Sequence, residues 1–138
     1  MKKISVILAA VLLLASSQAF AMRMEMVGGI RNGLAIGLLG EEWVNNDFAL
    51  RLGAEADTGN EGLIFLLGGK FYLTNLGDRT PLYLGLGMVG YVGTTGSLGL
   101  QASAIFDRLF GVRPLFMEAG ADFVANSIRL QLQLGYKF

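Results

Sequence analysis

The sequence contains no cysteine and no histidine, and only 2 of its 138 residues are proline. Without cysteine there is neither a disulfide framework nor a lipid-modified cysteine to anchor the chain. Without histidine and cysteine, the Ser-His and Cys-His nucleophile pairs and the usual ligands of zinc and other transition metals are also missing. We therefore expect no catalysis, no cofactor and no metal site.

A long apolar run is likewise missing from residues 22–138. No stretch there approaches the roughly 18 uninterrupted apolar residues that indicate a transmembrane helix. Even so, 53% of the residues are hydrophobic and the mean hydropathy is +0.52, which is high for a soluble domain. Apolar residues that are abundant but regularly interrupted are typical of a protein that crosses a membrane with β-strands.

The N-terminus has the order of a secretory signal peptide. The first three residues give a basic start, residues 4–15 form an apolar run, and Ala19 and Ala21 form a small-x-small cleavage site. The apolar run is shorter than the roughly 20 residues that a membrane-spanning helix needs, so an uncleaved anchor is the less favoured alternative. We predict cleavage after Ala21, which divides the chain into a signal peptide, 1–21, and a single domain, 22–138.

The charge balance indicates no charged macromolecular partner. The chain has 11 Lys+Arg and 11 Asp+Glu, and loss of Lys2 and Lys3 with the signal peptide leaves 9 basic residues against 11 acidic ones. Such a near balance gives no reason to expect a nucleic acid or an acidic partner.

Residues 128–138 show the clearest strand pattern. Every even position is apolar, whereas the odd positions hold arginine, glutamine, glycine and lysine. A helix would distribute these polar residues around its axis, but a strand places them all on one face. The same period of two, with turn residues between the segments, recurs along the chain and predicts eight strands. The predicted strands are residues 24–31, 34–44, 48–55, 63–74, a fifth from about residue 81, 98–110, 115–125 and 128–138.

The lengths of these segments are consistent with a closed barrel. Asn32-Gly33 between the first two segments is the strongest short hairpin signal, and eight strands of about 11 residues leave about four residues for each connection. An even number of strands places both termini on one side, as in bacterial outer-membrane barrels. The sequence therefore predicts an all-β fold, an eight-stranded antiparallel up-and-down transmembrane β-barrel after an N-terminal signal peptide. Which face of residues 34–44 and 63–74 points inward is left open.

Alternation alone does not decide whether the polar face points into a lumen or to water. A solvated exterior would be about 25 to 35% charged, whereas the polar face here holds glycine, serine, glutamine and isolated charges. We therefore favour an apolar exterior in lipid, with a soluble periplasmic lipocalin-like carrier as the alternative. The interior of an eight-stranded barrel is just wide enough for side chains to fill it, so its charges must pair. We expect a structural polar core, in preference to a proton or solute path, made of Glu25, Arg31, Arg51, Glu55, Lys70, Gln101, Glu118, Asp122, Arg129, Gln131, Gln133 and Lys137.

The last strand resembles the signal that the outer-membrane assembly machinery recognises. That signal consists of alternating apolar residues before a terminal phenylalanine, here Leu130, Leu132, Leu134, Tyr136 and Phe138. Together with Pro81-Leu-Tyr-Leu-Gly-Leu-Gly and Leu115-Phe-Met-Glu-Ala-Gly, it makes the chain similar to small eight-stranded outer-membrane β-barrels of the OmpA/OmpX type. The resemblance implies export, periplasmic chaperones and the barrel assembly machinery as partners during biogenesis, and outer-membrane lipid as the final surroundings.

The same resemblance implies a closed barrel without a wide channel. We expect it to be a monomer in the outer membrane of a Gram-negative bacterium. Members of the group that bind phage or host surfaces have long extracellular loops, whereas the outward connections predicted here are only a few residues each. We therefore expect a non-catalytic protein with a plugged polar lumen and a structural or membrane-integrity role. A narrow pore or a small-ligand-binding barrel is the alternative.

Overall fold

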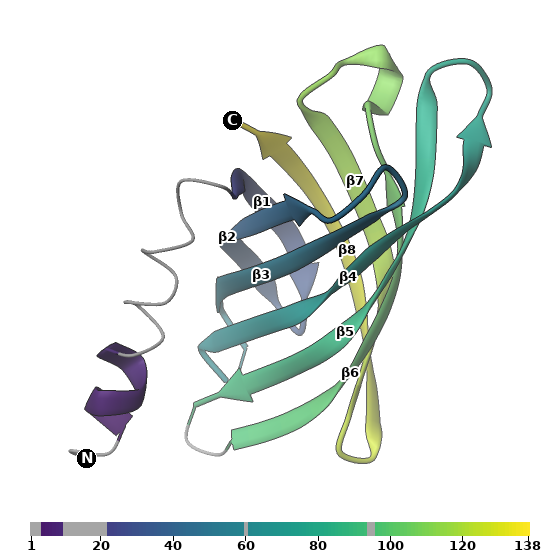
Figure 1. Cartoon of the computed structure of the whole chain (residues 1–138). Coiled ribbons are helices and arrows are strands. Elements are labelled where there is room, and N and C mark those ends of the chain that lie inside the picture. Colours follow the sequence, from purple (N-terminus) through teal and green to yellow (C-terminus); the bar gives the residue numbers. More distant parts are fainter. Residues whose placement is uncertain (1–3, 10–21, 60, 94–95) are drawn as a thin grey trace.

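The protein is described by a computed structural model that covers residues 4–9, 22–59, 61–93 and 96–138. In these residues eight antiparallel strands close into one barrel, in which each strand pairs with its sequence neighbours and β1 pairs with β8 (Figure 1). This confirms the predicted all-β, eight-stranded antiparallel fold. The strands are β1 (Arg23–Arg31), β2 (Leu34–Trp43), β3 (Phe48–Asp57), β4 (Leu63–Leu76), β5 (Thr80–Val92), β6 (Gly96–Phe106), β7 (Leu115–Val124) and β8 (Ser127–Lys137).

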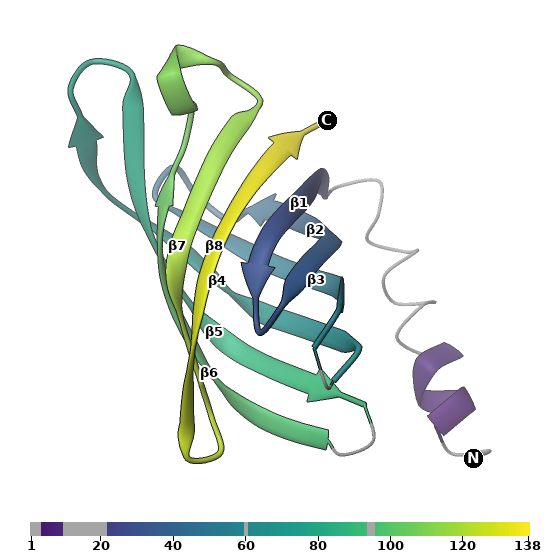
Figure 2. The same cartoon turned by 180° about the vertical axis from the view of Figure 1, so that it is seen from behind.

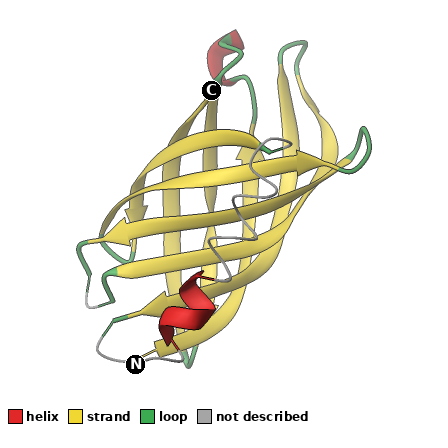
Figure 3. Ribbon diagram, turned by 60° about the vertical axis from the view of Figure 1, so that its left-hand side comes forward, coloured by secondary structure: helices red, strands yellow, loops and turns green. Residues whose placement is uncertain are grey.

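The strands that form the barrel wall are tilted (Figure 3). The view from behind shows β1 beside β8, where the barrel closes (Figure 2). We call the end that holds the start of β1 and the end of β8 the terminal mouth. The β2–β3, β4–β5 and β6–β7 connections lie at this end, and the other four connections form the hairpin mouth. Both ends of the barrel domain therefore lie on one side, as the even strand number predicts.

Alternation along the strands separates an interior face from an exterior one. In β8, for example, Gln131 and Gln133 are buried while Leu130 and Leu132 are exposed. The structure also shows which residues point inward in β2 and β4, the two strands for which the sequence left this open. Odd-numbered residues of β2 such as Leu39 point inward, as do even-numbered residues of β4 before its bulge.

The predicted end of the sixth strand is wrong. The sixth strand ends at Phe106 instead of residue 110, because Arg108 and Phe110 adopt left-handed backbone conformations with φ of 48° and 54° that no strand can accommodate. Residues Leu109–Gly111 instead form one 3₁₀ turn, η1. Strands β3 and β4 each extend two residues beyond their predicted ends, because pairing with neighbouring strands continues to Asp57 and Leu76.

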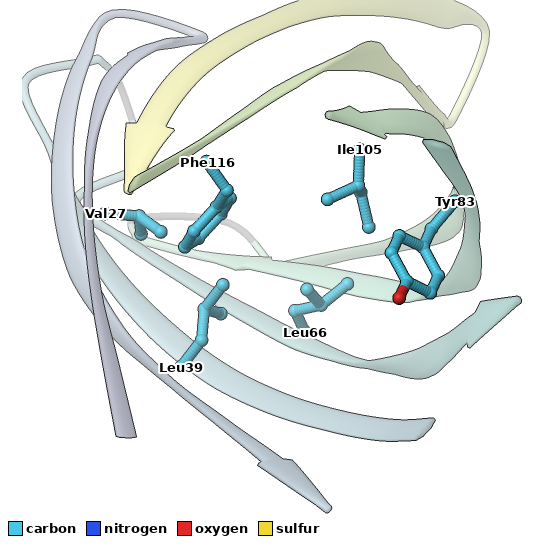
Figure 4. Packing of buried hydrophobic residues seen from close by; sticks show 6 residues of the cluster. All are labelled: Val27, Leu39, Leu66, Tyr83, Ile105 and Phe116. Atoms are coloured by element: carbon cyan, nitrogen blue, oxygen red, sulfur yellow. The ribbon is translucent and has the colours of Figure 1, made fainter. Parts of the chain in front are cut away.

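The interior is partly apolar, which the predicted polar core did not include. Six buried side chains, each from a different strand, point toward one another inside the barrel (Figure 4). A second buried cluster combines Ile64, Val89, Tyr91 and Val124. Apolar side chains therefore share the space between the ion pairs. The first cluster consists of Val27, Leu39, Leu66, Tyr83, Ile105 and Phe116.

Most of the predicted signal peptide, with its cleavage site at Ala19 and Ala21, lies outside the described residues. Residues 4–9 form a short helix. In the described part of the chain, none of the helical segments has the length and apolar character to cross a membrane.

Candidate functional site

The interior face brings the predicted polar residues together. Two of them, Arg129 and Lys137, lie near opposite mouths, with side chains 19% and 9% exposed. The other ten side chains are fully enclosed, each in a residue no more than 3% exposed. These ten are Glu25, Arg31, Arg51, Glu55, Lys70, Gln101, Glu118, Asp122, Gln131 and Gln133.

Arg51 on β3 is at the centre of the first group of contacts. Its Nη1 lies 2.8 Å from Oε1 of Glu118 on β7, across the barrel interior. Oε2 of Glu118 also accepts hydrogen bonds from Ser103 Oγ at 3.1 Å and Gln101 Nε2 at 3.4 Å. Further from Arg51, the carboxylates of Glu41 and Glu25 lie at 3.8 Å and 3.9 Å. One guanidinium therefore sits among three carboxylates.

Arg31 at the end of β1 organises a second group. It donates to both carboxylate oxygens of Asp122, from Nε at 2.8 Å and from Nη2 at 3.0 Å, which is the bidentate geometry that suits arginine. Its Nη1 lies 3.2 Å from Glu55 Oε2, and the hydroxyl of Tyr91 donates to Asp122. These residues come from β1, β3, β5 and β7, so the contacts connect opposite walls of the barrel.

Three glutamines join the two groups. Gln101 Nε2 donates to Gln131 at 3.3 Å, Gln131 Nε2 donates to Gln133 at 2.8 Å, and Gln133 Nε2 donates to Glu55 at 2.7 Å. An amide can donate and accept at once, so it can continue a chain between two carboxylates without adding charge. The Arg51 and Arg31 groups therefore form one continuous polar network.

At the terminal mouth the network ends in a row of alternating charges. Lys70 Nζ lies 3.2 Å from Glu41 and 3.6 Å from Asp107, and Asp107 in turn lies 2.6 Å from Lys137 Nζ. Burial opposes ionisation of Asp107, but the two lysines outweigh it and hold the pKa of this carboxyl below its ordinary value. Lys70 also lies 4.4 Å from the ring centre of Tyr83, within cation–π range.

The hairpin mouth is closed by a second ion pair. Nη1 of Arg129 lies 3.2 Å from Oε2 of Glu61, and the side-chain amide of Asn32 donates to the same oxygen at 3.2 Å. The Arg129 guanidinium covers the ring of Tyr91 at 4.3 Å from its centre. Charged groups therefore close the interior at both ends.

Three buried acids of this network were missing from the predicted set: Glu41, Glu61 and Asp107. The facing of β2 was undecided from the sequence, yet Glu41 is the register partner of Arg51, and that pairing is the signal that could have placed it. Asp107 continues the inward positions of β6 after Gln101 and Ser103. Glu61 lies in the β3–β4 connection, where a period of two gives no information.

Glu25 differs from the other buried acids. Neither of its carboxylate oxygens accepts a hydrogen bond from any described residue, although the side chain is fully enclosed. The cation paired with it is Arg51, at 3.9 Å, and Arg51 forms its shorter ion pair with Glu118. Within the described ranges, no three acidic side chains are grouped so that they could hold a metal ion. The interior chemistry is therefore pairing of charges and hydrogen bonding.

The residues of the predicted assembly signal lie on the outside of the barrel. Leu130, Leu132, Leu134 and Tyr136 are exposed along β8, and Phe138 follows the strand at the terminal mouth. The rings of Tyr136 and Phe138 meet edge to face, with centres 5.7 Å apart.

Comparison of the chain with protein-family models, with curated proteins and with solved structures finds no match.

Proposed function

We propose that this protein is a small β-barrel of a Gram-negative outer membrane, with a closed lumen and a structural or membrane-integrity role. The observation that carries the proposal is the distribution of side chains. The barrel has its ion pairs inside and, among the described residues, most of its leucines, isoleucines and phenylalanines outside, the reverse of a protein folded in water. The family expected from the last strand, outer-membrane barrels of the OmpA/OmpX type, remains part of this proposal.

The exterior is apolar over every strand. Monomeric soluble proteins rarely expose a contiguous apolar patch beyond a few hundred Å², whereas here large apolar side chains are exposed around the whole wall. An outward apolar band is what lipid requires of a transmembrane barrel, and strands are suited to it because their backbone groups are paired within the closed sheet. Exposed examples are Met26, Ile36, Leu38, Leu50, Leu52, Phe65, Leu67, Leu86, Met88, Leu98, Leu100, Phe123, Leu130, Leu132 and Leu134.

The enclosed interior supports a plugged lumen. A conducting pore needs a continuous column of water, but ten polar side chains of the network are fully enclosed between the two mouths. An eight-stranded barrel has an interior that side chains can fill. Arg51 on β3 with Glu118 on β7 spans that interior from wall to wall, and Arg31 with Asp122 joins β1 to β7 across the inner face of β8.

Cell fractionation followed by electrophoresis of unboiled and boiled samples tests the membrane assignment. We expect the protein in the outer-membrane fraction, with a faster band before boiling, because a closed barrel stays folded in the detergent. Recovery from the soluble periplasm with no heat-dependent change in mobility would support the lipocalin-like carrier and refute the proposal.

Conductance across a planar lipid bilayer tests the closed lumen separately. We expect no steady channels from the purified, folded protein. Steady single-channel currents would refute the plugged lumen and favour the narrow-pore alternative, while leaving the membrane assignment in place.

A further inference from the structure

We propose that the terminal mouth is a binding site for an organic phosphate, meaning a phosphate group attached to an apolar body. The inference goes beyond the proposed structural role and does not depend on whether the barrel exterior faces lipid. It rests on a cavity at the terminal mouth, on arginines that the fold leaves without a partner there, and on aromatic walls beside them.

The cavity has a volume of about 550 Å³, within the range of small-molecule sites. Its lining includes the paired Asp107 and Lys137. It also includes Trp43 and Tyr83, whose rings meet edge to face with centres 5.7 Å apart. Phe138 adds a third aromatic ring to the lining. An apolar ligand body would therefore find aromatic surface next to charge.

Three arginines line this cavity: Arg23 at the start of β1, and Arg108 and Arg113 in the β6–β7 connection. Within the described residues, none of their guanidinium groups takes part in an ion pair or hydrogen bond. Asp107, the acid of the lining, is already neutralised by Lys137 at 2.6 Å and Lys70 at 3.6 Å. The side chains that line the cavity therefore carry an excess of positive charge.

The β6–β7 connection that carries two of these arginines is fixed to the barrel. Asp107 N–H donates to the Pro81 carbonyl at 2.9 Å, and Lys137 N–H donates to the Pro114 carbonyl at 2.8 Å. The carboxylate of Asp107 accepts the backbone N–H of Arg108 at 3.1 Å, which supports the left-handed conformation of that residue. A site held in place before the ligand arrives loses less entropy on binding.

The chemistry of these groups selects the ligand. Guanidinium groups donate in a planar fork that matches the oxygens of phosphate, and such charge-assisted bonds are about twice as strong as neutral ones. A cationic ligand would be repelled by the unpaired arginines, and a neutral ligand would form no ion pair with them. Free phosphate monoesters and anionic phospholipid headgroups share this chemistry.

The test uses the full-length mature protein folded in a non-ionic detergent. Trp43 is the single tryptophan of the chain and lines the cavity, so its fluorescence reports on binding. The probes are phenyl phosphate, short-chain phosphatidylglycerol, and benzyl alcohol as the uncharged comparison. We expect a saturable change with at least one of the two phosphates and none with benzyl alcohol. Whichever phosphate binds at lower concentration identifies the source.

The double variant Arg108→Asn with Arg113→Gln removes two of the charges, and asparagine tolerates the left-handed conformation at residue 108. We expect its affinity for the preferred phosphate to fall at least tenfold. Arg79→Gln is the matched control, because Arg79 is an exposed arginine of the same mouth that does not line the cavity. Arg23→Gln, on a different strand, is a second independent variant that we also expect to bind more weakly.

Folding of each variant is checked by its heat-dependent mobility. No saturable change with either phosphate would overturn the proposal. Equal affinity of the double variant and the wild type would overturn it as well. So would an equal loss in Arg79→Gln, because that result would mean that general surface charge attracts the probe.

Discussion

Glu118 and Glu25 are both enclosed carboxylates in the barrel, but their surroundings differ. Glu118 accepts hydrogen bonds from Arg51, Ser103 and Gln101, whereas Glu25 accepts none from the described residues. Breaking a buried ion pair costs several kcal/mol because it leaves an uncompensated charge. We expect Glu118→Gln to lower the free energy of unfolding by about 3 kcal/mol, and Glu25→Gln to change it little. Urea unfolding followed by Trp43 fluorescence measures both, and an equal loss in the two variants would contradict the contact pattern.

Asp107 predicts a pH dependence of stability. Its folded-state pKa lies below the unfolded value of about 4, so its contribution is fully present above pH 4 and is lost as the pH falls through the folded value. Asp107→Asn keeps an oxygen for the Arg108 N–H but loses the attraction to Lys70 and Lys137. We expect the variant to be about 2 kcal/mol less stable at pH 7.

The difference between wild type and Asp107→Asn should shrink below pH 4, because the wild-type carboxyl then becomes neutral too. Unfolding midpoints measured at several pH values from 7 to 2.5 check this. A difference that stays constant over the whole range would mean that Asp107 acts through packing and not through charge.

For individual side chains, the period of two was sufficient to place most of those in the interior. It identified Gln131 and Gln133 because they alternate with leucines in an unbroken strand. It could not identify Glu61, which lies in a connection, or determine which charges pair, because partners such as Arg51 and Glu118 are 67 positions apart in sequence. Pairing depends on how the barrel closes, and that is not a property of any single segment.

Glycines at particular strand positions allow neighbouring strands to approach closely. A Cβ at Gly120 on β7 would collide with the carbonyl oxygen of Ala102 and lie 2.6 Å from the Cα of Ser103, so backbone would have to move. A Cβ at Gly28 on β1 would meet its nearest neighbour, the Ala35 carbonyl oxygen, at 3.7 Å, an ordinary contact. We expect Gly120→Ala to destabilise the barrel by about 2 kcal/mol and Gly28→Ala to be neutral or slightly stabilising.

Thermal unfolding, followed by the loss of the fast electrophoretic band, compares these two glycine variants. Equal midpoints for Gly120→Ala and the wild type would show that β6 and β7 can separate without cost at this point. The substitution tests the packing of β6 against β7, because a Cβ at Gly120 would meet backbone atoms of β6, which cannot move aside as the end of a side chain can.

The end of β8 provides a prediction about assembly. The N–H of Phe138 donates to the Met24 carbonyl at 3.0 Å, and the ring is 70% exposed, so its deletion removes little from the folded state. If the last strand is recognised during insertion, deletion of Phe138 should reduce the yield in the outer membrane severalfold. Replacement of Asn126 in the β7–β8 turn by serine should reduce it much less. Unimpaired refolding of both variants in detergent would show that the defect lies in assembly, whereas equal membrane yields would argue against a C-terminal signal.

The existence of the strands and their pairing order followed from the sequence, but the conformation of the β6–β7 connection did not. Phe110 continues the apolar even positions of β6, but the left-handed backbone at Arg108 and Phe110 ends the strand. Composition carries little information about such a conformation at an arginine. The site proposed at the terminal mouth depends on this connection and was therefore not visible in the pattern.

The apolar exterior of the barrel faces either lipid or water, and a single charged substitution can distinguish the two. Leu132 lies on the exterior of β8 and is 52% exposed, while Leu34 at the start of β2 near the hairpin mouth is 67% exposed. In water, arginine at either position would change stability by no more than about 0.5 kcal/mol. In lipid, arginine costs about 2 to 4 kcal/mol near the bilayer midplane and about 0 to 1 near the interface.

We therefore expect Leu132→Arg to destabilise the protein in lipid vesicles by about 3 kcal/mol and Leu34→Arg by less than about 1 kcal/mol. Reversible unfolding in guanidinium chloride, followed by Trp43 fluorescence, measures both. The positions are matched because both leucines are exposed in the barrel itself, so neither variant leaves a cavity. Equal, negligible effects would mean that the apolar exterior does not face lipid. A large cost at Leu132 alone requires a low-dielectric layer around the middle of the barrel, which no soluble carrier has.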